Sequence, residues 1–90
     1  MSFLMEKFVY LGTAKTDEDI YGHFYRAIGQ ARKFYGEQPF KLFATQKILD
    51  TLGMLWLEHL EVKVTPETNR RADLYLEKHI VATVQDWRNP

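Results

Sequence analysis

The sequence predicts a mixed α/β domain in which a compact β-α-β-α-β unit is followed by a C-terminal helix. Two stretches carry this prediction. Residues 40–65 have the pattern of a strand, a helix and a second strand, and residues 17–35 have that of an amphipathic helix with signals at both ends. With 90 residues, 46% of them hydrophobic and 27% charged, the chain has the size and composition of one globular domain. We expect that domain to span residues 1–90, with residues 1–5 poorly ordered.

The first predicted strand is Lys7–Leu11, a run of strand-forming residues that ends at Gly12. The segment GTAKT after it begins with a glycine, as phosphate-binding loops do. It lacks the second glycine and the Lys-Ser/Thr pair of such loops, so we interpret it as a plain connection.

The first predicted helix spans Asp17–Tyr35. Thr16 can cap its first turn, Asp19 occupies the capping-box position, and Gly36 follows where a C-terminal cap belongs. The apolar stripe consists of Ile20, Phe24, Ala27, Ile28, Ala31 and Tyr35. This spacing predicts that one face of the helix packs against the core.

The central stretch supplies the rest of the core. Residues 40–44 alternate as a strand does, and Thr45 can then cap a helix that we expect to fray near Leu57. Gly53 either lies inside this helix or ends it. The apolar face of the helix is Ile48, Leu49, Leu52, Leu55 and Trp56. Residues 60–64 alternate again and predict a third strand that stops before a proline.

The segment after this strand is compatible with two structures. Residues 65–67 resemble a helix start, and apolar residues then recur at Ala72, Leu76, Ile80, Val84 and Trp87. We favour the resulting C-terminal helix. The alternative is an α+β fold with a C-terminal strand that pairs with residues 60–64 through a loop around Asn69. That strand consists of Leu74, Leu76 and Ile80 with the β-branched Val81, Thr83 and Val84.

The hairpin alternative would bring together groups that can bind a metal. It places His59 opposite His79 and Glu61 opposite Glu77. The favoured helix separates them, and the three histidines of the chain lack the spacing of a zinc site. We therefore predict no metal site.

Composition excludes several classes of protein. Without cysteine the chain has no disulfide, no thiolate nucleophile and no sulfur ligand for zinc. Twelve basic and twelve acidic residues cancel, so no global field attracts the chain to nucleic acid or to an anionic membrane. No apolar run is long enough to span a bilayer and the N-terminus lacks the pattern of a leader, so we expect a cytoplasmic protein.

No residue pattern predicts catalysis. Ser2 is the only serine, and neither a nucleophile elbow nor a dinucleotide-binding glycine pattern is present. His23 follows the acidic first turn of the predicted helix, where a general acid or base is conceivable, although a helix histidine is ordinarily structural. We predict no catalytic residue and no cofactor.

The favoured interpretation of function is a non-catalytic protein-interaction domain that self-associates as a homodimer or higher oligomer. Six Phe, five Tyr and two Trp are more large side chains than a core of this size readily hides. Tyr21 and Tyr25 lie one turn apart on the first predicted helix, and Gly22, Arg26 and Gly29 form a neighbouring face that another backbone can approach. These five residues are the predicted contacts.

Two other functions compete with this interpretation. The first is a small-ligand-binding or enzymatic domain with a polar pocket beside the first helix, to which His23, Tyr21 or the adjacent Arg70 and Arg71 contribute polar groups. The two arginines are the candidate anion-binding residues. The second is a nucleic-acid-associated protein, which the balanced charge does not favour.

Overall fold

The computed structural model describes residues 8–53 and 60–89 and confirms the mixed α/β class. In chain order the elements are β1 (Tyr10–Ala14), α1 (Asp17–Tyr35), β2 (Lys41–Thr45), α2 (Gln46–Leu52), β3 (Glu61–Thr65), the 3-10 helix η2 (Glu67–Asn69), β4 (Arg71–Leu76) and β5 (His79–Asp86). The predicted β-α-β-α-β order is thus correct. The expectation for residues 1–5 lies outside the described residues.

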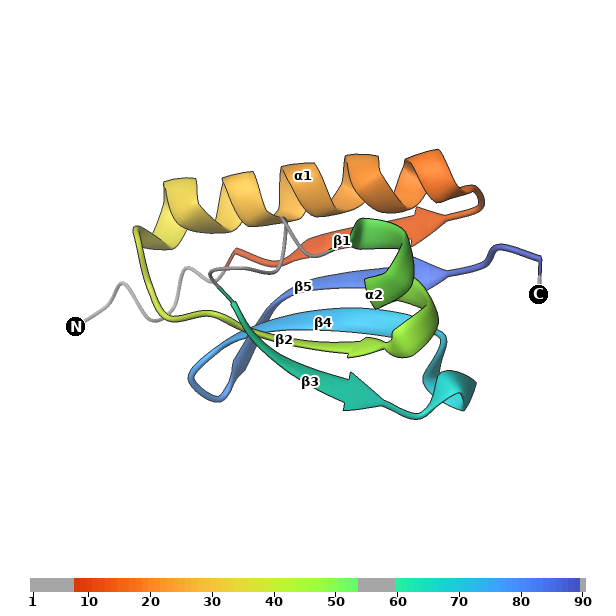
Figure 1. The fold of residues 1–90 in the computed structure, drawn as a ribbon. Helices are drawn as coiled ribbons and strands as arrows, with labels where there is room; N and C mark the ends of the chain where they lie inside the picture. The colour runs from red at the N-terminus through yellow and green to blue at the C-terminus, as the bar shows by residue number, and fades with distance from the viewer. Residues whose placement is uncertain (1–7, 54–59, 90) are drawn as a thin grey trace.

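The strands form one five-stranded sheet in the order β1-β5-β4-β2-β3. β1 is parallel to β5 and β2 is parallel to β3, whereas β4 is antiparallel to both of its neighbours, β5 and β2. Four strands therefore run in one direction, and their carboxyl ends lie at the same end of the sheet. Figure 1 shows α1 and α2 on one face of this sheet.

The core lies between this face and the two helices. Its buried apolar side chains are Ala14, Ile20, Phe24, Ala27, Ile28, Ala31, Phe40, Leu42, Ala44, Ile48, Leu49, Leu52, Ala72, Leu74, Val81, Ala82 and Val84. Side chains of successive strand residues point to opposite faces, so the residues between these on the strands lie on a face that neither helix covers. We call this second face the open face.

The signals at the ends of α1 act as predicted. Thr16 Oγ1 accepts a hydrogen bond from the Asp19 backbone N–H at 3.1 Å, and Asp19 Oδ2 accepts one from the Thr16 N–H at 3.2 Å, which completes the capping box. At the other end Gly36, with φ of 86°, donates its N–H to the Arg32 carbonyl. The positive φ at Gly36 explains why a glycine ends this helix.

Two predicted boundaries differ from the structure. β1 does not end at Gly12 but runs through it to Ala14, because the strand pairs with β5 as far as Asp86. Thr45 caps α2 as predicted, but Gly53 ends the helix with φ of 80° and does not lie inside it. The predicted continuation of α2 towards Leu57 falls outside the described residues.

The favoured C-terminal helix is wrong. Residues 71–86 form the antiparallel pair β4 and β5, joined at Glu77 and Lys78. The hairpin alternative is thus correct in giving this segment strand structure, but wrong in making it one strand. Its predicted partner is wrong, since β4 pairs with β2 and not with β3. Glu61 consequently pairs with Lys41, and His79 with Leu76. His59 lies outside the described residues.

Candidate functional site

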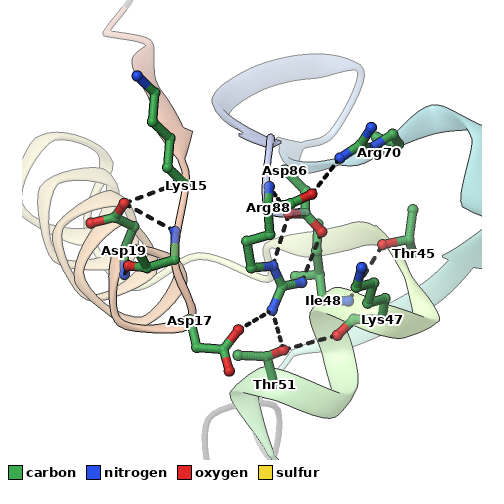
Figure 2. Close-up of polar contacts among 11 residues, drawn as sticks. Lys15, Asp17, Asp19, Thr45, Lys47, Ile48, Thr51, Arg70, Asp86 and Arg88 are labelled. Carbon is green, nitrogen blue, oxygen red and sulfur yellow. Dashed lines mark hydrogen bonds and ion pairs between the residues drawn. The ribbon is translucent and has the colours of Figure 1, made fainter. Parts of the chain in front are cut away.

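A buried arginine organises the polar groups at the carboxyl ends of the strands. The Arg88 residue is only 6% exposed, and its Nε and Nη2 donate to Asp86 Oδ1 and Oδ2, each at 2.8 Å. Its Nη1 donates to Asp17 Oδ1 at 2.9 Å and to Thr51 Oγ1 at 2.6 Å. As Figure 2 shows, one guanidinium thereby joins the start of α1, the side of α2 and the end of β5.

These contacts shift the ionisation of both partners. Hydrogen bonds from the Arg88 side chain hold the pKa of Asp86 below its usual value, against the effect of burial. The hydrogen bonds to Asp86 raise the pKa of Arg88, and the hydrogen bond to Asp17 raises it further. The Asp86 carboxylate and the Arg88 guanidinium thus form a stable ion pair. This cluster has the chemistry of a structural support and not of an acid or base catalyst.

Next to this cluster lies a pocket of about 560 Å³. Its lining consists of Thr68, Asn69, Arg70, Arg71, Gln85, Asp86, Trp87, Arg88 and Asn89. The two arginines singled out as anion-binding candidates therefore line one pocket, at the carboxyl end of β5. No ligand pattern in the sequence indicated Trp87 as their neighbour, because the predicted helix placed it on an apolar stripe.

Of the five predicted contact residues on α1, the two tyrosines are the most prominent. Tyr25 is 68% exposed and Tyr21 is 43% exposed. A Cβ built at Gly29 would meet nothing within 4 Å, and one at Gly22 would meet only the guanidinium of Arg26. No backbone among the described residues approaches either glycine, so the function of this surface stays a prediction.

His23 lies on another side of α1 and has a structural explanation. Its Nε2 is 3.0 Å from the Thr13 carbonyl oxygen, which can only accept, so Nε2 carries the proton. The Tyr10 hydroxyl lies 2.7 Å from Nδ1 and can donate to it, while Arg26 Nε donates to that hydroxyl at 3.2 Å. A Cβ at Gly12 would fall 2.5 Å from Nδ1, so the glycine makes room for the imidazole.

This histidine protects the outer edge of the sheet. The Ala14 carbonyl accepts from Trp87 on the β5 side, and neighbouring residues of a strand direct their carbonyls to opposite sides. The Thr13 carbonyl therefore faces away from β5, at the edge of β1 where no described strand pairs, and it contacts His23. Covering an exposed strand edge in this way limits unwanted strand pairing.

The open face carries apolar and aromatic side chains at two places, Leu11 on β1 and a group on β2, β4 and β5, with Thr83 and Asp73 between them. Leu11 is in register with Thr83, Thr83 with Asp73, and Asp73 with Phe43, while Tyr75 is in register with Ile80. Leu11 is 74% exposed, and the Phe43 and Tyr75 rings pack edge to face at 5.0 Å. We call Leu11, Phe43, Tyr75 and Ile80 the open-face patch.

The described residues offer no group of three or more His, Asp or Glu side chains that could hold a metal ion. In the same part of the chain no helix is long and apolar enough to cross a membrane. No protein-family model, curated protein or solved structure matches the chain. Function has to be inferred from the surfaces described above.

Proposed function

We propose that this chain is a non-catalytic, cytoplasmic interaction domain that forms a homodimer through the open-face patch. The observation that carries the proposal is that these side chains lie on a face that neither helix covers, where Leu11 is 74% exposed, whereas the other face packs against the helices. Aromatic side chains such as Phe43 and Tyr75 are enriched in protein interfaces. A domain of this size buries a modest share of its surface on its own, so a second copy adds stability.

The charges support a second copy as the partner. The chain carries no formal net charge, so two copies do not repel one another as a whole. Beside the patch, Asp73 accepts from Arg71 at 3.1 Å, and Lys63 pairs with Glu61 at 3.8 Å. Bringing two open faces together about a twofold axis therefore confronts these two ion pairs, which each copy has already formed, together with Lys41, which is in register with Tyr75.

The predicted contact surface on α1 is a second candidate for self-association. Tyr25 projects into solvent there, and the open space at Gly29 leaves room for the backbone of another helix. The two surfaces lie on different sides of the molecule, since α1 covers the face opposite to the patch. Variants of one surface therefore serve as controls for the other.

Light scattering at several protein concentrations tests this proposal. We expect a mass of twice 10.7 kDa for the unaltered chain, and a monomer for Leu11→Thr, which keeps a strand-forming residue but removes apolar contact area. Tyr25→Ser is the matched control and should remain a dimer. A monomer at every concentration would overturn self-association, and dissociation by Tyr25→Ser alone would move the interface to α1.

A further inference from the structure

The pocket beside Arg88 has the size of a ligand site. It lies at one end of the sheet, where the end of β5 and the start of its antiparallel neighbour β4 form one wall. Thr68 and Asn69 contribute another wall from the β3–β4 connection. About 560 Å³ is within the range of pockets that hold small molecules.

The charged groups left over in this pocket are donors. Both carboxylate oxygens of Asp86 accept from Arg88, and both oxygens of the nearby Asp73 accept from Arg71 and Thr83. Among the described residues, the two terminal nitrogens of Arg71 have no hydrogen-bond partner, and Arg70 has no carboxylate within ion-pair distance. Two positive charges with free N–H groups favour an anionic acceptor.

Arg70 is held in place before any ligand arrives. Its backbone adopts a left-handed conformation, with φ of 50° and ψ of 44°, which is uncommon for a residue other than glycine or asparagine. Its N–H donates to the Glu67 carbonyl at 3.3 Å, and its carbonyl accepts from the Asp86 N–H at 2.8 Å. The guanidinium donates through Nη2 to the Arg88 carbonyl at 2.6 Å, visible in Figure 2.

Trp87 adds an aromatic surface to these donors. The residue is 61% exposed although it borders the pocket, and its indole Nε1 donates to Gln85 Oε1 at 2.8 Å. This bond orients the ring without covering it. An exposed indole beside guanidinium groups is suited to stacking on a planar ring and to binding an attached anionic group.

From these observations we propose that the pocket binds a mononucleotide, with the base stacked on Trp87 and the phosphate held by Arg70 and Arg71. The ligand is a mononucleotide and not a nucleic-acid strand, because a strand needs a track of cations and the chain has no net positive charge. This site is additional to the dimer contact. It adjoins the open face through Arg71, which alternates with Asp73 and Tyr75 on β4, but it does not include the four residues of the open-face patch.

Titration calorimetry with adenosine 5′-monophosphate, adenosine and inorganic phosphate tests the proposal on the full chain. We expect the nucleotide to bind, and the two fragments to bind roughly tenfold more weakly or worse, because each makes only part of the contacts. In a ¹H–¹⁵N spectrum the indole N–H signal of Trp87, assigned by its loss in Trp87→Leu, should shift on binding.

Three variants locate the site. Arg71→Gln and Trp87→Leu should each weaken nucleotide binding roughly tenfold or more, whereas Lys63→Gln, a remote cation on the same sheet, should not. Arg70→Asn keeps a residue that tolerates the left-handed conformation and should weaken binding as Arg71→Gln does. Circular dichroism verifies that each variant folds.

Several results would overturn this site. They are the absence of binding at millimolar nucleotide, equal affinity for phosphate and nucleotide, unchanged binding by the folded Arg71→Gln and Trp87→Leu variants, or tighter binding of a single-stranded oligonucleotide than of the mononucleotide. The oligomeric mass, measured separately, decides the proposed dimer, so failure of one proposal leaves the other standing.

Discussion

Arg88 shows how one side chain determines what surrounds it. A buried guanidinium requires acceptors for its N–H groups, and here they come from three elements that are distant in the sequence. Asp17 is 71 residues away from Arg88 along the chain. Asp86 is only two residues from Arg88, but no local pattern could have predicted Asp17 and Thr51 as the other acceptors, because they meet Arg88 only after the sheet has formed. The adjacent Arg70 and Arg71, by contrast, were recognisable from the sequence alone.

We predict that the ionised carboxylate of Asp86 stabilises the folded state at pH values above its pKa. Folding lowers the pKa of Asp86 below its ordinary value of 3.8. The stabilisation of the folded state by this carboxylate is therefore complete above about pH 4 and is lost as the pH falls through the lowered pKa. Asp86→Asn leaves Arg88 buried without its carboxylate, so we expect a loss of about 3 to 5 kcal/mol in unfolding free energy at pH 7.

Urea unfolding of both proteins between pH 7 and pH 2 provides the measurement. The difference in unfolding free energy between the unaltered chain and Asp86→Asn should narrow as the pH falls, since protonation of Asp86 removes the same charge that the substitution removes. The variant should keep some acid sensitivity, because the Lys15 N–H lowers the pKa of Asp19 in both proteins. A constant difference down to pH 2 would show that ionised Asp86 is not what stabilises the fold.

Among the elements, the two glycines at positions 12 and 29 have opposite surroundings. Gly12→Ala should destabilise the fold by about 1 to 2 kcal/mol, because a Cβ displaces His23 from the Thr13 carbonyl. Gly29→Ala should stabilise α1 by about 0.5 to 1 kcal/mol, since the added methyl group meets nothing. Chemical denaturation measures both effects. In a His23→Ala background the Gly12→Ala change should cost much less; an equal cost would exclude the imidazole as the reason for this glycine.

Local signals predicted α1 well and the C-terminal segment poorly. The limits of α1 follow from Thr16, Asp19 and Gly36, which act on neighbouring backbone groups. Ala72, Leu76, Ile80 and Val84 are four residues apart, a spacing that fits a helical stripe and is also a multiple of the two-residue strand period. The turn between β4 and β5 could not be recognised from the sequence, because Glu77 has a φ of 56° although it is neither a glycine nor an asparagine. The segment forms strands and not a helix, and its first strand, β4, pairs with β2.

For the whole molecule, the open face has a thermodynamic consequence. If the dimer forms on that face, unfolding includes dissociation, and the melting temperature must rise with protein concentration. We expect a rise of roughly 3–5 °C for each tenfold increase in concentration, and no rise for Leu11→Thr. Differential scanning calorimetry provides the test, and a melting temperature independent of concentration in the unaltered chain would argue for a folded monomer.

The order of the sheet also dictates when its parts can form. Among the strands of residues 8–53 and 60–89, the only neighbour of β1 is β5, which follows the others in the chain. During synthesis, residues 10–14 therefore have no strand to pair with until residues 82–86 have left the ribosome. Because contacts between such distant segments slow folding, the sheet gains its fifth strand late, and α1 must wait for β5 before the surface beneath it is complete.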